Sequence, residues 1–373
     1  MRVIISAAGT GGHINPAIAI ANKIKEKEPD SKIIFIGTNR GLENDLVPRA
    51  GYELKTIEAY GLKKEISFKN LIHIIKTIRS SKEVKTIIDE FKPDLVLGTG
   101  GYICGPVISV AISKNIPTVL HESNAYPGKA VKMFSKEVDL VLTGFKEAKN
   151  RLTECKKVVV TGTPTKIKKI KIDENRKREI LKELGIKNNL PIVLIFGGSQ
   201  GAKAINDAVF DLIINKLNKE YQIIWSAGAK QYDIIKENFE KENIYINHLT
   251  NVKILPYIYN MEEMMNISDL LVARSGAMTI TEVAIVGKPA IFIPLPSKSA
   301  NRQEDNARVL EKIGAAKIIL NKDVNAEKLS EEIDDIIYKK TELEEMGRLA
   351  NRLAPSNVEE KIYTEIKKIL GEK

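Results

Sequence analysis

The sequence has little cysteine, few aromatic residues and no long apolar run, and each shortage excludes a class of protein. The two cysteines, Cys104 and Cys155, show no metal-ligand spacing, which excludes a disulfide framework and is typical of unpaired thiols in a reducing compartment. Aromatic residues make up 6% of the chain without a basic-aromatic motif, which argues against nucleic-acid binding. No apolar stretch approaches the ~18 residues of a membrane span, and no apolar signal segment follows Met1.

Several nucleotide-related motifs are also missing. No glycine-rich segment is followed by the lysine of a Walker A motif, which argues against an ATPase. The dinucleotide fingerprint is incomplete, and no acidic residue stands at Ile36-Gly37-Thr38, so a nicotinamide cofactor is not expected. No Asp-x-Asp motif is present to hold a metal against a nucleotide diphosphate. We therefore expect neither a cofactor nor a resident metal.

What the sequence does contain is a glycine-rich segment, Gly9-Thr10-Gly11-Gly12-His13, between a β-prone run and a segment typical of a helix. Glycines at such a turn let the bare backbone approach a ligand, and the first N–H groups of the helix point at it, which suits a diphosphate. His13 adds a titratable side chain beside that anion site. From the residues alone, His13 is either a proton acceptor or a structural group that hydrogen-bonds the glycine segment or a phosphate.

Apolar strands alternate with longer amphipathic segments, which predicts parallel α/β architecture. A chain of 373 residues is too long for one ordinary core, so we expect two domains, 1–163 with a C-terminal helix, and 164–356. Helices are predicted over 16–27, 68–91 and 357–370. The predicted strands span 3–6, 32–36, 95–98, 118–121, 140–143, 158–161, 192–196, 222–226, 252–256, 270–273 and 290–293.

Glycine-rich turns recur after other predicted strands. The segment 197–202, Gly-Gly-Ser-Gln-Gly-Ala, follows the first strand of the second half, and Gly98-Thr99-Gly100-Gly101-Tyr102 follows a strand of the first half. Ligands of parallel sheets bind outside the carboxyl ends of the strands. We therefore expect the active site in a cleft between two Rossmann-like halves. Backbone N–H groups, helix ends and hydroxyls such as that of Ser199 would stabilise leaving-group charge there.

Three further polar segments suit a ligand. The quartet His121-Glu122-Ser123-Asn124 ends a predicted strand and is typical of a ligand-lining segment. Arg274 precedes a helix that contains Glu282, whose carboxylate suits a ribose diol or else complements the helix dipole. The run 301–307 has amides that suit sugar hydroxyls, or it is a solvated loop with a helix cap.

The net charge of +10 points to a polyanionic partner, although a lysine-rich organism would give the same excess. Residues 63–76 interleave apolar and cationic side chains. That pattern suits docking on anionic lipid, or an ordinary core-facing helix.

Together, the segments 9–16, 98–106, 121–124, 197–202, 274–282 and 303–307 resemble the MurG family of bacterial N-acetylglucosaminyltransferases, and the resemblance covers essentially the whole chain. It implies a GT-B fold of two Rossmann-like domains, with the last helix crossing back to the first domain. It also implies inverting transfer of GlcNAc from UDP-GlcNAc to the muramoyl 4-hydroxyl of lipid I, giving lipid II for peptidoglycan, cell shape and division. The alternatives are another GT-B enzyme, such as a glycolipid glycosyltransferase or a UDP-GlcNAc 2-epimerase, and a non-catalytic UDP-sugar-binding module.

The resemblance also assigns residues and a location. His13 would be the catalytic base, and a peripheral position on the cytoplasmic face of the cell membrane is implied. Arg274 would lie near the uracil, and Glu282 would bind the ribose. Lys166 stands where members often carry an arginine, and Asp305 replaces an aromatic residue. The implied substrate-binding residues are Thr10, Gly11, Gly12, Asn124, Lys166, Ser199, Gln200, Arg274, Glu282, Gln303 and Asn306; the acceptor-diphosphate loops hold Gly9, Gly100, Gly101 and Tyr102; the membrane patch is Ile66, Phe68, Leu71, Ile72 and Ile75.

Overall fold

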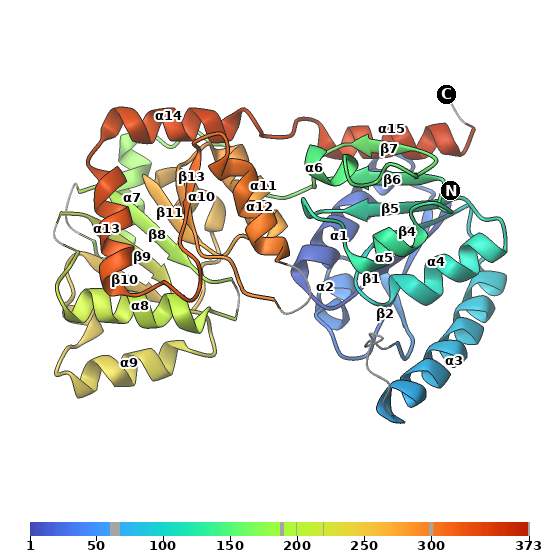
Figure 1. Cartoon of the computed structure of the whole chain (residues 1–373), viewed down its shortest axis with the longest axis horizontal. Coiled ribbons are helices and arrows are strands. Elements are labelled where there is room, and N and C mark those ends of the chain that lie inside the picture. Colours follow the sequence, from blue (N-terminus) through green and yellow to red (C-terminus); the bar gives the residue numbers. More distant parts are fainter. Residues whose placement is uncertain (60–67, 187–189, 199, 219, 298–300, 372–373) are drawn as a thin grey trace. The chain divides into compact units, whose positions relative to one another are not determined.

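A computed structural model describes residues 1–59, 68–186, 190–198, 200–218, 220–297 and 301–371, with the side chains of 68–79 outside this description (Figure 1). The chain forms two compact units. Unit 1 comprises residues 1–165 and 355–373, and unit 2 comprises residues 166–354. Among the described residues, no helix is long and apolar enough to cross a membrane.

Unit 1 is built on a seven-stranded sheet in the order β3-β2-β1-β4-β5-β6-β7, in which neighbouring strands pair in parallel. Its strands are β1 (Arg2–Ala7), β2 (Lys32–Gly37), β3 (Glu53–Thr56), β4 (Leu95–Gly100), β5 (Thr118–Glu122), β6 (Leu140–Thr143) and β7 (Val158–Val160). Its helices are α1 (Gly11–Lys27), α2 (Glu43–Arg49), α3 (Phe68–Phe91), α4 (Cys104–Ser113), α5 (Lys129–Phe134), α6 (Lys146–Lys149) and α15 (Val358–Ile369).

Unit 2 repeats the plan with a six-stranded sheet in the order β10-β9-β8-β11-β12-β13, again with parallel neighbours. Its strands are β8 (Ile192–Phe196), β9 (Gln222–Ser226), β10 (Val252–Leu255), β11 (Leu270–Ala273), β12 (Ala290–Phe292) and β13 (Ala316–Ile318). Its helices are α7 (Glu174–Glu183), α8 (Lys203–Ile214), α9 (Tyr232–Lys241), α10 (Met261–Ile267), α11 (Ala277–Val286), α12 (Arg302–Glu311), α13 (Ala326–Ile337) and α14 (Lys340–Asn351), with a short 3₁₀ turn η1 (Ile246–His248).

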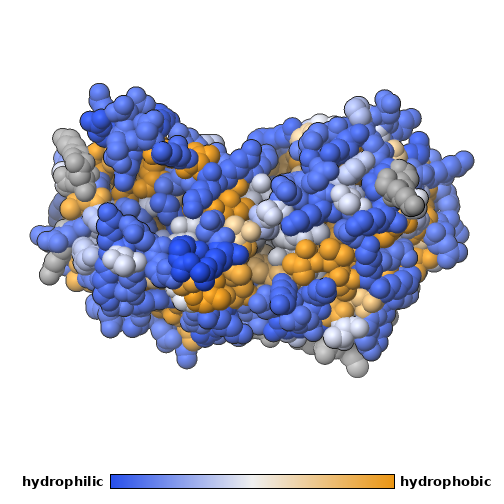
Figure 2. All heavy atoms as spheres, turned by 90° about the horizontal axis from the view of Figure 1, so that it is seen from above, coloured by the Kyte–Doolittle hydropathy of each residue, from blue (hydrophilic) through white to orange (hydrophobic). Residues whose placement is uncertain are grey.

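The central strands are continuous apolar runs because helices cover both faces of each sheet. In β1, Val3 and Ile5 pack against α1 and α15, whereas Ile4 packs in the cluster that includes α4 (Figure 1). In unit 2, α8, α9 and α13 cover one face in the same way. On the surface, large apolar side chains such as Tyr259, 94% exposed, are the exception. The face shown in Figure 2 is correspondingly mostly hydrophilic.

The strand order places the glycine-rich turns. In unit 1 the order reverses between β1 and β4, so the turns that follow these two strands are neighbours at the carboxyl edge of the sheet. In unit 2 the reversal lies between β8 and β11. Such switch points are where open parallel sheets bind ligands, since the chain leaves adjacent strands in opposite directions there.

The predicted fold class is confirmed, and every predicted strand is present within one or two residues of its predicted ends. The strands β3 and β13 were not predicted, because β3 is a mostly exposed edge strand and β13, an edge strand of sequence Ala-Lys-Ile, lacks a continuous apolar run. The first helix begins at Gly11 instead of residue 16, which places His13 in its first turn and not in a loop. Pro16 therefore lies inside α1 and not at its start. Because proline has no N–H group, one backbone hydrogen bond of the helix is missing at this position.

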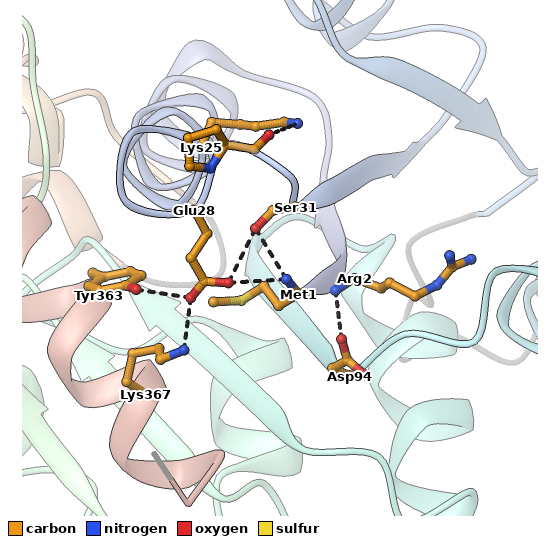
Figure 3. Close-up of polar contacts among 9 residues, drawn as sticks. Met1, Arg2, Lys25, Glu28, Ser31, Asp94, Tyr363 and Lys367 are labelled. Carbon is orange, nitrogen blue, oxygen red and sulfur yellow. Dashed lines mark hydrogen bonds and ion pairs between the residues drawn. The ribbon is translucent and has the colours of Figure 1, made fainter. Parts of the chain in front are cut away.

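Helix α15 is held against the rest of unit 1 by a half-buried charge cluster around Glu28 (Figure 3). The Glu28 carboxylate accepts hydrogen bonds from Lys367 at 2.8 Å, Tyr363 at 2.9 Å and the Met1 amino group at 3.1 Å. Burial alone would raise the pKa of Glu28, but these three donors outweigh it and hold the pKa at about 2. The apolar face of α15, including Ile362 and Ile366, completes the attachment.

Glu28 therefore predicts an acid-sensitive contribution to stability. Its pKa is lowered from 4.5 to about 2, so the stabilisation is complete above pH 4.5 and is lost as the pH falls toward 2. We expect Glu28→Gln to lower the free energy of unfolding at pH 7 by roughly 1–3 kcal/mol. Chemical denaturation of the wild type and Glu28→Gln between pH 7 and 3 measures this. The difference between their free energies of unfolding should narrow as the pH falls. A difference that stays constant over that range would contradict the assignment.

Candidate functional site

The first glycine segment forms a strand-to-helix turn with His13 in the first turn of α1. Gly9 has φ +96°, a backbone conformation that favours glycine. The N-cap residue Thr10 makes no side-chain capping hydrogen bond, and no acidic residue lies in the first turn. The first turn of α1 itself therefore contributes no acidic side chain to offset its dipole, and the acidic group that approaches it, Glu43, binds the Gly9 N–H ahead of the helix.

The ring of His13 makes a contact that favours one tautomer. Its Nδ1 lies 3.2 Å from the carbonyl oxygen of Ala8. A carbonyl oxygen can only accept, so Nδ1 carries the hydrogen and the lone pair of the neutral ring is on Nε2. The His13 carbonyl in turn accepts a hydrogen bond from Thr99 Oγ1 at 2.8 Å. His13 is thus anchored by both glycine turns, with Nε2 as the basic atom.

The second glycine turn packs directly against the first. A Cβ on Gly100, at φ +127°, would lie 2.5 Å from His13 Cδ2 and 2.8 Å from Nε2, so only glycine leaves room for the ring. A Cβ on Gly101 would lie 2.8 Å from Ala8 O. Beneath this turn, the buried Cys104 thiol contacts the Gly100 N–H at 3.3 Å, and burial raises its pKa. Tyr102 is 42% exposed at the end of the turn.

The polar quartet 121–124, whose first two residues end β5, is more buried than expected for a ligand-lining segment. His121 and Glu122 are 1% and 4% exposed, and burial lowers the pKa of His121 to about 4, so that it is neutral. Its Nε2 contacts the carbonyl of Gly162 at 3.2 Å. Glu122 accepts hydrogen bonds from the Asn124 N–H at 2.8 Å and side-chain amide at 2.9 Å. These buried groups therefore shape the turn, and Asn124 is the half-exposed member of the quartet.

In unit 2 the glycine turn after β8 meets the turn after β9. Gly201 and Gly228 have φ of +74° and +89°, and a Cβ on Gly201 would lie 2.2 Å from Ala227 O. The turn after β8 therefore lies in direct backbone contact with the turn after β9, which leaves no room for a side chain at Gly201. Gln200 is exposed on it, and Ser199 lies outside the described residues.

The turn after β11 carries the second predicted group of unit 2. Arg274 donates to the Ile293 carbonyl at 2.9 Å and to Asn321 Oδ1 at 2.7 Å, which ties it to the end of β12. Asn306 is fully buried and donates to the Ser275 carbonyl at 3.2 Å. Glu282 is half-buried in the second turn of α11.

The remaining predicted residues are spread more widely. Gln303 accepts from the Leu295 N–H at 2.9 Å, and Lys166 is exposed where unit 2 begins. Ile66 lies outside the described residues, as do the side chains of Phe68, Leu71, Ile72 and Ile75. Within the described part of the chain, no three His, Cys, Asp or Glu side chains group as metal ligands would.

Sequence reasoning missed one residue of this site. Glu43, at the start of α2, is fully buried and accepts a hydrogen bond from the Gly9 N–H at 2.9 Å. It lies 34 residues from Gly9 in the chain. The available signal was weak: a glutamate that shortly follows two glycines, Gly37 and Gly41.

Two family models match the chain. One is described as the glycosyltransferase family 28 N-terminal domain and covers residues 3–143, and the other as the C-terminal domain of that family, over 192–362. Each match lies largely or wholly within one of the structural units.

Full-length relatives carry one name. A UDP-N-acetylglucosamine--N-acetylmuramyl-(pentapeptide) pyrophosphoryl-undecaprenol N-acetylglucosamine transferase of Acetivibrio thermocellus is 43% identical over 375 residues, covering 100% of this chain and 99% of the relative. A transferase of the same name from Caldanaerobacter subterraneus subsp. tengcongensis is 40% identical over 369 residues, covering 99% and 100%.

Solved structures agree with this picture. MurG of Acinetobacter baumannii has a TM-score of 0.77 and 26% identity, covering 98% of this chain and 99% of that chain. MnaA of S. aureus with UDP has a TM-score of 0.71 at 17% identity, covering 100% and 97%, and shares the fold. Fold and neighbours thus define a glycosyltransferase of the GT-B class. The chain belongs to glycosyltransferase family 28, and the predicted resemblance to MurG proteins is confirmed.

The contact between the glycine turns predicts the effect of adding one methyl group. We expect Gly100→Ala to displace the His13 ring, to lower transferase turnover about 10-fold or more, and to cost roughly 1–3 kcal/mol in stability. The matched control is Gly105→Ala, since a Cβ there meets nothing within 4 Å. Turnover and the free energy of unfolding of both variants measure this. Equal activity of the two variants would contradict the close contact.

Proposed function

We propose that this chain transfers GlcNAc from UDP-GlcNAc to the 4-hydroxyl of the muramoyl sugar of lipid I, with inversion, and so makes lipid II for peptidoglycan. The observation that carries the proposal is full-length identity of 40–43% to relatives named as N-acetylglucosamine transferases that act on UDP-N-acetylglucosamine and N-acetylmuramyl-(pentapeptide) pyrophosphoryl-undecaprenol. Cell-wall growth, cell shape and division would depend on this product.

The first unit would bind the acceptor. The anionic diphosphate of lipid I suits the N-terminus of α1 and the adjoining glycine turns, where backbone N–H groups and the helix dipole meet. A helix N-terminus contributes up to roughly 2 kcal/mol for a well-placed anion. The resemblance assigns this role to Gly9, Thr10, Gly11, Gly12, Gly100, Gly101 and Tyr102.

His13 would be the general base. As the muramoyl 4-hydroxyl oxygen attacks C1 of GlcNAc, its proton passes to Nε2, the basic atom of the tautomer fixed by the Ala8 carbonyl. The bond from C1 to the β-phosphate oxygen breaks, and UDP leaves with the electron pair. One displacement inverts the anomeric configuration, and no covalent sugar-enzyme intermediate forms.

The second unit would bind the donor. Arg274 would lie near the uracil, Glu282 would accept hydrogen bonds from the ribose hydroxyls, and the 197–202 turn would bind the diphosphate at the start of α8. Backbone N–H groups in that turn would offset the charge of departing UDP. The other proposed donor contacts are Asn124, Lys166, Ser199, Gln200, Gln303 and Asn306.

We also propose peripheral binding to the cytoplasmic face of the cell membrane, since the acceptor is a polyprenyl lipid. The support is the alternation of apolar and cationic residues over 63–76 and the net charge of +10.

Removing the base should chiefly slow the chemical step. We expect His13→Ala to lower kcat by about 10²–10⁴-fold, with the KM for UDP-GlcNAc within about threefold of the wild-type value. Transfer of labelled GlcNAc to a lipid I analogue measures both constants. His248→Ala is the matched control, because His248 is exposed in η1, and it should keep full turnover.

The same assay separates the alternatives. In Glu282→Ala the loss should fall mainly on donor binding, seen as a raised KM for UDP-GlcNAc. Epimerised UDP-sugar without lipid product would indicate a 2-epimerase, and UDP-GlcNAc binding without turnover would indicate a binding module. Wild-type turnover in His13→Ala would remove the histidine from the mechanism.

The membrane proposal has its own test. We expect replacement of Leu71, Ile72 and Ile75 by glutamine to reduce sedimentation with anionic phosphatidylglycerol vesicles about 10-fold or more, since each buried apolar side chain contributes about 1.5–3 kcal/mol. Turnover with a short-chain, water-soluble acceptor should be unchanged. Equal sedimentation of variant and wild type would place the membrane contact elsewhere.

A further inference from the structure

The least explained group near the site is the buried carboxylate of Glu43. It begins α2, is fully buried, and accepts three hydrogen bonds. Oε2 accepts from the Gly9 N–H at 2.9 Å, and Oε1 accepts from the Thr38 N–H at 3.0 Å and the Thr38 hydroxyl at 2.7 Å. Burial alone would raise the pKa of Glu43, but these donors outweigh it and the pKa lies below its ordinary value. Glu43 is therefore an anion inside the protein.

The surrounding backbone is shaped to admit this carboxylate. A Cβ on Gly41 would lie 2.0 Å from Oε2, and a Cβ on Gly37 would lie 2.8 Å from Cγ. Neither glycine has the positive φ that would otherwise explain its choice. The two glycines thus make room for the side chain that reaches Gly9.

One rigid group joins Glu43 to His13. The Gly9 N–H, which donates to Glu43, and the Ala8 carbonyl, which accepts from His13 Nδ1, belong to the same planar peptide. Holding one end of a planar peptide fixes the direction of the other. A negative charge on the N–H side also polarises the peptide and strengthens its carbonyl as an acceptor.

We propose that Glu43 is a positioning residue for His13, acting through the Ala8–Gly9 peptide to hold the ring in the Nδ1–H tautomer with its lone pair on Nε2. The effect on turnover rests on the proposed role of His13 as base, whereas the effect on the tautomer does not. Glu43 touches neither substrate nor the reacting atoms in this account.

Asp139 offers a control for the general effect of losing a hydrogen-bonded carboxylate. Asp139 also accepts from a backbone N–H and the hydroxyl of one threonine, Thr118, at 2.9 and 3.1 Å. It lies at the amino ends of β5 and β6, the opposite edge of the same sheet. Asp139 is less buried than Glu43 and also pairs with Lys156 at 3.1 Å, and Asp139→Asn removes one carboxylate charge that accepts from backbone and hydroxyl donors at the edge of the sheet opposite His13.

The test compares Glu43→Gln with Asp139→Asn in the full chain. Long-range ¹H–¹⁵N spectra report which ring nitrogen of His13 carries the hydrogen, with the His13 signals assigned by their loss in His13→Ala. We expect the wild type and Asp139→Asn to show the Nδ1–H form, and Glu43→Gln to shift toward Nε2–H. Glu43→Gln should lower kcat about 10-fold or more with the KM for UDP-GlcNAc within about twofold, whereas Asp139→Asn should keep kcat within about twofold.

An Nε2–H tautomer in the wild type, or an unchanged tautomer and kcat in Glu43→Gln, would overturn the proposal. If Glu43→Gln does not fold, Thr38→Val keeps the charge and removes one donor, and it should shift the tautomer in the same direction by a smaller amount. If the tautomer shifts in Glu43→Gln while His13→Ala keeps full turnover, the positioning role stands and the proposed base fails.

Discussion

The structure of the candidate site depends on one contact, the close packing of two glycine turns in unit 1, one of which lies directly against the His13 ring. The parallel order of the sheet brings the turns after β1 and β4 together, and glycines at 100 and 101 let them touch. The Ala8–Gly9 peptide lies in the middle, hydrogen-bonded on one side to Glu43 and on the other to His13. The N-terminus of α1 and the His13 ring, held on the Ala8 carbonyl, therefore lie in the same turn.

Unit 2 also contains two closely packed glycine turns, but with different neighbouring residues. Its glycine turn after β8 packs on the turn after β9, where Gly201 and Gly228 approach without side chains. No histidine stands in this turn, and Arg274, Glu282 and the exposed Gln200 provide polar groups suited to a nucleotide. Two copies of one architecture thus present different side chains beside their glycine turns, a histidine in unit 1 and an arginine, a glutamate and an amide in unit 2.

Much of the fold could be predicted from the sequence because apolar strands and glycine turns are local signals. The position of β3 could not, since an exposed edge strand lacks apolar alternation, and glycines at 11 and 12 concealed the start of α1. The role of Glu43 depends on a contact across 34 residues, which no local pattern carries. The burial of His121 and Glu122 could not be predicted either. A polar cluster at the end of a strand is typical of a ligand-lining segment, whereas these two side chains contact backbone groups inside the protein.

The central claim is that the paired glycine turns of unit 1 bind the acceptor diphosphate beside His13. Amide NMR of the full chain tests it most directly, by titrating a water-soluble lipid I analogue and UDP separately. The account predicts that the analogue shifts the backbone amides of 9–13 and 98–102, whereas UDP shifts those of 197–202 and 274–282. An analogue that leaves 9–13 and 98–102 unshifted, or UDP that shifts them in preference to unit 2, would contradict it.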